Sequence, residues 1–241
     1  MRAVYLDYLS EQNCQVGGMI VVDGESAHHL TRVVRIKCQE RVLLLNGNGL
    51  VVHACVQEVR KSDVLVKIVS ITQEKPKDML HLALGMPKKD SVEEILRMCV
   101  EIGISKIIPI SSHYAQLDEL GISTRTKRIM ESAAIQANNP FLPTITDKVS
   151  PTKLAQLAGG YEQVFCFCSI PSEKQRYDFE KLSGELPSLI LIGPEAGFSP
   201  EEESGWAHIP NIFFIHLPTY ILRATSAVAV ASGYVLSKIK D

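Results

Sequence analysis

The chain has 241 residues, which is enough for one large domain or two small ones with a substantial core. Hydrophobic residues make up 46% and charged residues 22%, an ordinary composition for a soluble globular protein. No apolar run is long enough to span a membrane, and the N-terminus has no signal-peptide core, so we expect a cytoplasmic protein with no membrane partner. The net charge of −2 excludes a protein that coats nucleic acid through bulk charge, but it permits a local basic patch.

The first 72 residues consist of short β runs. These runs read MIVVDG, ERVLLLNGNG, LVVHACVQEV and DVLVKIVSI, and two Asn-Gly pairs at 46–47 and 48–49 predict a hairpin turn. The stretch HHLTRVVRIK, residues 28–37, predicts one or two helical turns between them. Strands this short and evenly spaced predict a small barrel.

The densest basic cluster of the chain lies in this first part. It consists of Arg32, Arg35, Lys37 and Arg41. Two interpretations stay open for it. A solvated face is one, and contact with RNA phosphates is the other.

From about residue 75 the pattern alternates between strands and helices. The strands read MLHLALGM, SKIIPIS, TIT, QVFCFC, SLILIG and FFIHL, and helical stretches separate them. The helix SVEEILRMCVEIG is expected to begin with a capping box from Ser91 to Glu94 and to end at Gly103. This alternation predicts a parallel sheet covered by helices on both faces. We therefore expect two domains, residues 1–72 and 73–241.

Cysteine and histidine positions argue against a metal site. Neighbouring His28 and His29 would rarely share a metal. The cysteines show no CxxC spacing, so we expect reduced, mostly buried thiols and neither zinc nor disulfides. They are Cys14, Cys38, Cys55, Cys99, Cys166 and Cys168.

Ligands of open α/β sheets bind beyond the carboxyl ends of the strands. Three such ends lie at residues 165–171, 191–197 and 216–223, and the middle one reads LIGPEAG. It lacks the GK[ST] of a phosphate loop and the GxGxxG of a dinucleotide fold. The acids at 201–203 are also explained as a helix start, but Glu195 inside the turn is not. These acids would repel phosphate and favour a cationic ligand.

S-adenosyl-L-methionine is a nucleoside that carries positive charge and no phosphate. Gly193 and Gly197 would let the main chain approach it closely. Apolar walls for its adenine could come from Ile192, Leu217, Ile221 and Leu222.

The stretch GPEAGFSPEE resembles the GPEGGFS-type motif of the SPOUT methyltransferases. In particular, it is similar to the family that methylates N3 of a uridine in bacterial 16S ribosomal RNA. Four further stretches resemble that family in the same order, and together they cover almost the whole chain. They are HHLTRVVRIKCQERVLLLNGNG, VEIGISKIIPI, ESAAIQ and LPTYILRATSA.

The resemblance implies an α/β protein with a small PUA-like β-barrel and a C-terminal parallel SPOUT domain that contains a trefoil knot. It also implies a homodimer that acts on 16S ribosomal RNA of the small subunit. Arg223 would hold a uracil carbonyl or a phosphate and stabilise the anionic ring. Arg32, Arg35, Lys37 and Gln136 would contact the RNA. The S-adenosyl-L-methionine site would consist of Phe167, Cys168, Ile192, Gly193, Pro194, Glu195, Gly197, Leu217, Ile221 and Leu222.

Six positions depart from the family pattern. Glycine is usual at Ala196 and Pro218, an acid at Thr225, and a basic residue at Met98, Asn139 and Tyr220. Two alternatives therefore stay open: an RNA-binding protein that has lost activity, and a SPOUT methyltransferase with another RNA target. No general base is clear, and for Glu195 we favour a cofactor-facing or turn-stabilising role.

The last helix, residues 224–240, has no charge before Lys238. A helix that is apolar nearly all round needs cover on both sides. One side can pack on its own sheet, and a second copy of the chain or the N-terminal barrel could cover the other. We expect a second copy, which could approach closely over Ala229, Ala231, Ser232 and Gly233.

Overall fold

The computed structural model describes residues 2–117, 120, 122–168 and 182–239. It divides into two compact units. One comprises Met1–Pro76 with Met130–Leu142, and the other comprises Lys77–Ile129 with Pro143–Asp241. In the described part of the chain, no helix is both long and apolar enough to cross a membrane. The domain boundary between residues 72 and 73 stays a prediction.

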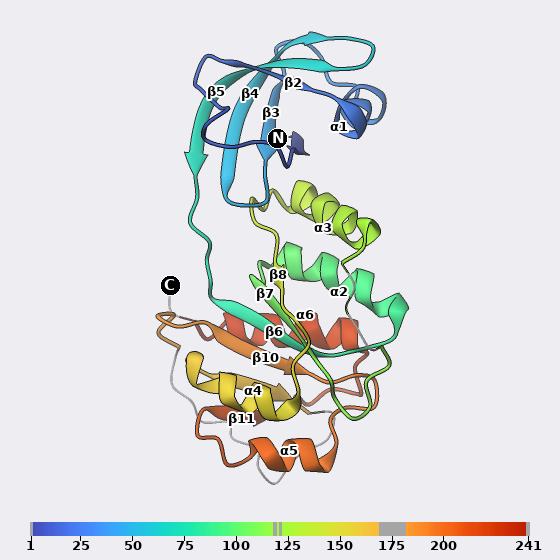
Figure 1. Cartoon of the computed structure of the whole chain (residues 1–241), viewed down its shortest axis with the longest axis vertical. Helices are drawn as coiled ribbons and strands as arrows, with labels where there is room; N and C mark the ends of the chain where they lie inside the picture. Colours follow the sequence, from blue (N-terminus) through green and yellow to red (C-terminus); the bar gives the residue numbers. More distant parts are fainter. Residues whose placement is uncertain (1, 118–119, 121, 169–181, 240–241) are drawn as a thin grey trace. The chain divides into compact units, whose positions relative to one another are not determined.

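The first unit contains a five-stranded sheet of order β1-β3-β4-β5-β2 (Figure 1). The pair β1 and β3 is parallel, and the other neighbouring pairs are antiparallel. The ladder ends at β1 and β2, so the predicted barrel is a half-barrel. Its strands are β1 (Arg2–Tyr5), β2 (Met19–Val22), β3 (Arg41–Leu45), β4 (Leu50–Val59) and β5 (Val64–Gln73).

A short helical segment interrupts these strands, as predicted. Helix α1 (Gly24–His28) continues into one π-helical segment, η1 (His29–Val34). Arg35 ends this segment in the left-handed conformation, with φ of 54°. Leu30 and Ile36 are buried in the core that the inner faces of the strands form, and they fix the segment to the sheet.

The predicted hairpin between β3 and β4 is confirmed. Gly47 and Gly49 have φ of 81° and 91°, a region that favours glycine. Leu142 donates its N–H to the Gly47 carbonyl, and a Cβ at Gly49 would lie 2.7 Å from the ring of Phe141. These close contacts explain why residues 130–142 belong to the first unit, whereas the sequence pattern groups them with the second.

The second unit contains a six-stranded sheet of order β11-β9-β10-β6-β7-β8, and every pair in it is parallel. The parallel sheet predicted from the sequence is therefore confirmed. Its strands are β6 (Leu80–Gly85), β7 (Lys106–Ile110), β8 (Thr144–Ile145), β9 (Val164–Phe167), β10 (Ser188–Ile192) and β11 (Ile212–Ile215).

Helices cover both faces of this sheet (Figure 1). Leu154 and Trp206 bring α4 and α5 onto one face. On the other face α6 packs against α2 and β10. The helices of this unit are α2 (Lys89–Ile102), α4 (Pro151–Leu157) with the 3-10 turn η2 (Ala158–Gly160), α5 (Pro200–Trp206) and α6 (Ala224–Leu236). Helix α3 (Thr124–Ala137) begins in this unit, and its residues from Met130 onward belong to the first unit.

The start of α2 corrects one prediction. The helix begins at Lys89, so Ser91 and Glu94 lie inside it and form no capping box. The predicted end is confirmed, because Gly103 caps the helix with φ of 87°. A capping box does occur at α5, where Ser199 and Glu202 cap each other's backbone N–H groups.

Helix α6 packs one side against its own unit and exposes the other. Ala231 and Ser232 are buried within the chain, so they cannot be the small residues that a second copy approaches. Val230 is 41% exposed and Leu236 is 36% exposed. These two side chains therefore mark the exposed side of α6.

Candidate cofactor site

A cavity lies at the carboxyl ends of β9, β10 and β11, where ligands of parallel sheets bind. All ten residues predicted for the S-adenosyl-L-methionine site line it. The other lining residues are Ala196, Phe198, Glu203, His216, Thr219, Tyr220, Ala224 and Ala227. Of the predicted strand end at 165–171, residues 169–171 lie outside the described residues.

Small residues allow the loop after β10 to reach the sheet. A Cβ at Gly85, the last residue of β6, would lie 2.5 Å from Cδ of Pro194. A Cβ at Gly193 would lie 2.9 Å from the carbonyl carbon of Gly197. Gly197 has φ of 77°, with open space where a Cβ would stand. The loop therefore depends on glycine for close backbone contacts and for one left-handed turn.

The charged lining of the cavity is acidic. Among the described residues that line it, Glu195 and Glu203 are the carboxylates, and there is no Lys or Arg. His216 is the remaining titratable side chain besides Cys168 and Tyr220. A phosphate group would be repelled here, whereas a cationic ligand would be attracted.

Three glutamates of the stretch GPEAGFSPEEE, residues 193–203, serve different purposes. Glu195 accepts the backbone N–H of Lys88, 3.1 Å away, at the start of α2. This contact supports the turn-stabilising role favoured for Glu195. Glu202 is buried and accepts the N–H groups of His113 and Ser199. Glu203 faces the cavity and lies 3.8 Å from Sγ of Cys168.

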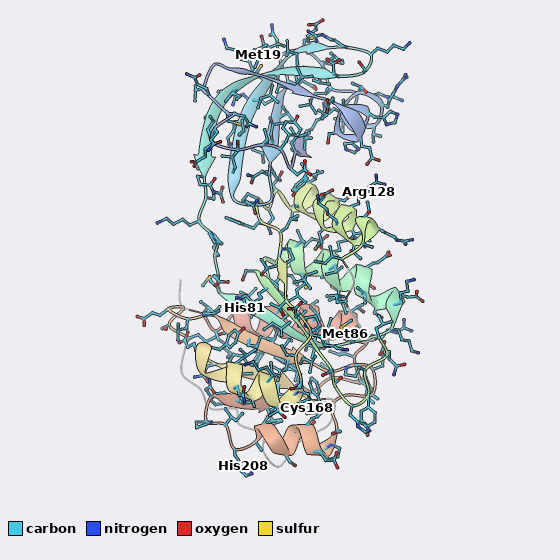
Figure 2. All side chains as sticks on the ribbon, in the orientation of Figure 1. Met19, His81, Met86, Arg128, Cys168 and His208 are labelled. Atoms are coloured by element: carbon cyan, nitrogen blue, oxygen red, sulfur yellow. The ribbon has the colours of Figure 1, made fainter. Side chains whose placement is uncertain are left out.

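The buried thiol next to the cavity, Cys166, is not an activated nucleophile. Cys166 on β9 is fully buried, and its hydrogen bond with Cys168 together with burial raises its pKa well above the usual range. Cys168 follows β9 at the cavity (Figure 2). All six cysteines are free thiols. The described residues contain no group of three or more His, Cys, Asp or Glu side chains that could hold a metal ion.

The remaining predicted site residues lie outside the cavity lining. Arg223 is exposed and is the N-cap residue of α6, between the lining residues Leu222 and Ala224. It therefore stands at the rim of the cavity. The residues predicted to contact RNA are exposed in the first unit, and they are Arg32, Arg35, Lys37 and Gln136.

Sequence reasoning missed Glu203 and His216 as cavity residues. The sequence pattern assigns Glu203 only to the helix start, and it includes His216 in the strand end at 216–223 without giving its side chain a role. Their positions in the chain could have identified them as cavity residues. His216 directly follows β11, and Glu203 lies one turn into α5, the helix that follows the loop after β10. Side chains at the carboxyl ends of parallel strands converge on one edge of the sheet.

A second polar cluster lies at the opposite edge of the same sheet. His81, labelled in Figure 2, lies near the start of β6. Its Nε2 bonds Asp78 at 2.7 Å, and its Nδ1 bonds the Tyr161 hydroxyl at 3.0 Å. Burial lowers the pKa of His81, although Asp78 acts in the other direction. Its place at the amino ends of the strands separates it from the cavity and indicates a structural role.

Two known domain families match this chain. Residues 73–236 match the family model described as an RNA methyltransferase domain, and residues 22–69 match the RNA methyltransferase PUA domain. Because the first match covers more than half of the chain, this protein belongs to the RNA methyltransferase family.

Curated relatives point to one group within this family. The chain is 24% identical over 232 residues to the ribosomal RNA small subunit methyltransferase E of Rickettsia conorii, covering 95% of this chain and 93% of that protein. It is 28% identical over 243 residues to the protein of the same name from Helicobacter pylori strain J99, covering 96% and 98%.

Solved structures share the fold over the full length. A ribosomal RNA small subunit methyltransferase E from Neisseria gonorrhoeae, bound to S-adenosyl methionine, superposes with a TM-score of 0.81 at 20% identity, covering 99% and 98%. A putative methyltransferase from Legionella pneumophila, in complex with the same cofactor, superposes with a TM-score of 0.75 at 20% identity. The match covers 99% of this chain and 98% of that protein. The predicted fold class, a PUA-like domain followed by a parallel α/β SPOUT domain, is confirmed.

Proposed function

We propose that this protein is an S-adenosylmethionine-dependent ribosomal RNA methyltransferase that methylates N3 of a uridine in 16S RNA of the small subunit. The observation that carries the proposal is the cavity, because ten residues chosen from three separate strand ends line one space. Relatives named as small subunit methyltransferases and neighbours bound to S-adenosyl methionine support the substrate class and the donor. Uridine N3 rests on the motif resemblance.

The residues of the cavity fit the proposed donor. The acidic lining would complement its sulfonium and ammonium charges, and Ile192, Leu217, Ile221 and Leu222 would face its adenine. The open space beside Gly197 would accept a ligand that contacts the main chain. When bound, S-adenosylmethionine supplies an activated methyl group, so positioning of the target nitrogen can account for much of the rate.

Arg223 is the proposed catalytic residue. Its side chain is exposed at the rim, where it could hold a uracil carbonyl or a phosphate next to the cavity. After N3 of the uridine loses its proton, the ring is anionic, and a guanidinium would stabilise it. Replacing Arg223 with Lys keeps the charge but removes the two-pronged geometry, so we expect a large loss of rate with little loss of donor affinity.

We further propose that the first unit binds the RNA and that the protein works as a homodimer in the cytoplasm. Arg32, Arg35, Lys37 and Gln136 are exposed and would contact the substrate. The exposed side of α6, with Val230 and Leu236, would be the surface for the second copy. The trefoil knot and the domain limits 1–72 and 73–241 belong to the same proposal.

Two measurements test this function. Calorimetry with S-adenosylmethionine tests the cavity, and absence of binding would favour the alternative of an RNA-binding protein that lost activity. Incubation with small subunits from a deletion strain, followed by mass mapping of the 16S RNA, should reveal one added methyl group on N3 of one uridine. A methyl group on transfer RNA or on a ribose would favour a SPOUT enzyme with another target.

A further inference from the structure

The segment after β11 exposes two large apolar side chains beside the cavity. Tyr220 is 96% exposed and Ile221 is 77% exposed, more than any other large hydrophobic side chain in the described part of the chain. Both residues line the cavity. Single exposed apolar residues are common on protein surfaces, but two adjacent ones at the opening of a ligand site require a reason.

The segment holds Tyr220 in a defined place. Thr219 donates its N–H to the Leu217 carbonyl at 2.7 Å, which closes a tight turn just before Tyr220. Three residues later, Arg223 is the N-cap residue of α6, and Ala224 is buried. The backbone at Tyr220 is therefore held between a tight turn and the start of a helix, while the aromatic ring itself remains in water.

The chemistry of this segment matches an unpaired RNA base. Proteins hold extruded or single-stranded bases by stacking them on aromatic rings, while nearby arginines contact phosphates or carbonyl groups. Tyr220 offers the ring, and the exposed Arg223 offers the cation three residues away. A base that receives a methyl group from the cavity must also lie at its opening.

We propose that Tyr220 is the stacking platform that positions the target base at the opening of the donor cavity. This inference rests on the proposed function and adds a positioning residue to it. Tyrosine stands here where a basic residue is usual in the family that the sequence resembles. The base would thus be held through its flat face instead of through a second cation. The alternative is that a second copy of the chain covers the Tyr220 ring, and the experiment below distinguishes that copy from the target base.

Three substitutions at this position isolate the ring. Tyr220→Phe keeps the ring, Tyr220→Leu keeps apolar bulk without it, and Tyr220→Ala removes both. We expect kcat/KM for small subunits to fall about tenfold or more in the Leu and Ala variants and to stay within about twofold in the Phe variant. The affinity for S-adenosylmethionine should change less than kcat/KM in all three, because the other lining residues of the cavity stay in place. Ile122→Ala, at a 61% exposed position of the same unit, is the matched control and should leave kcat/KM unchanged.

A second readout does not depend on turnover. Ultraviolet irradiation of the wild-type protein with small subunits should crosslink a uridine to the peptide that contains Tyr220, as mapped by mass spectrometry. Equal activity of the Leu and Phe variants, or a crosslink only elsewhere, would overturn the platform. Conversion of a dimer into a monomer by Tyr220→Ala in light scattering would instead assign the ring to the second copy. If the wild-type protein transfers no methyl group, the proposed function fails, whereas the crosslink still decides the role of Tyr220.

Discussion

Replacing Gly85 with alanine should disturb the donor cavity from a position outside its lining. Gly85 ends β6, a central strand of the parallel sheet, and its missing side chain leaves room for Pro194. An added Cβ would lie 2.5 Å from Cδ of Pro194 and 3.0 Å from its nitrogen. Non-bonded carbon atoms prefer about 3.5–4.0 Å, so the overlap is roughly 1 Å.

This overlap cannot be relieved cheaply. The proline ring is rigid, and Leu84 and Gly85 of the strand are buried and paired with β7. Forcing an extra methyl group into a packed site costs about 1–3 kcal/mol. The softer partner is the loop at 193–197, which would move away from the sheet and change the cavity. We therefore expect a loss of about 1–3 kcal/mol in unfolding free energy and at least about tenfold weaker S-adenosylmethionine binding.

Urea unfolding measures the first effect, and calorimetry measures the second. The matched control is Gly205→Ala in α5, where no atom lies within 4 Å of the added Cβ. The unfolding free energy of that variant should rise by about 0.5–1 kcal/mol, because alanine is the better helix former. Its affinity for S-adenosylmethionine should equal that of the wild type. If Gly85→Ala were as stable as the wild type and bound S-adenosylmethionine equally well, the contact with Pro194 would not shape the cavity.

Three further predictions address charge and assembly. Glu203→Gln should weaken S-adenosylmethionine about fivefold or more and S-adenosylhomocysteine much less, because only the former carries a sulfonium charge; equal losses in calorimetry would contradict this. Reversing the charges of Arg32 and Arg35 should weaken binding to small subunits and leave the affinity for S-adenosylmethionine unchanged. The logarithm of the binding constant should also fall less steeply with the logarithm of the salt concentration, by about 0.9 for each lost phosphate contact. An unaltered slope would make the cluster a solvated face. Val230→Glu should convert a dimer into monomers of 26.6 kDa by light scattering, and a monomeric wild type would refute the proposed interface.

The sequence was sufficient for the parallel sheet and for the place of the cavity. Alternating strands and helices admit few arrangements, and the carboxyl ends of parallel strands meet at one edge. Glycine and acid spacing then identified the loop after β10. These features depend on contacts between neighbours in sequence or between successive strands, and local sequence patterns are informative about such contacts.

Long-range contacts decided the features that the sequence did not predict. Ser91 and Glu94 fit a capping box, yet α2 starts earlier because Glu195, distant in the chain, accepts the N–H of Lys88. A helical projection groups the residues of α6 by face but cannot tell which face the chain itself covers. Ala231 is 1% exposed and Val230 is 41% exposed, so the smaller residue packs inside and the larger one faces outward.

The acidic motif shows how one run of like charges can be stable. Glu202 is buried, but its two oxygens accept the N–H groups of His113 and Ser199, so the desolvation of its carboxylate is offset by two hydrogen bonds. Glu195 is bound to the N–H of Lys88. Each of these two carboxylates ties a separate segment of the chain to the loop after β10. Glu203 contacts a cavity thiol, and its charge adds to that of Glu195 in the lining. Glu195 and Glu202 thus stabilise the loop, and Glu195 and Glu203 give the cavity a negative potential that favours a cationic ligand. For this reason an acidic loop can stand where other α/β proteins have a phosphate-binding loop.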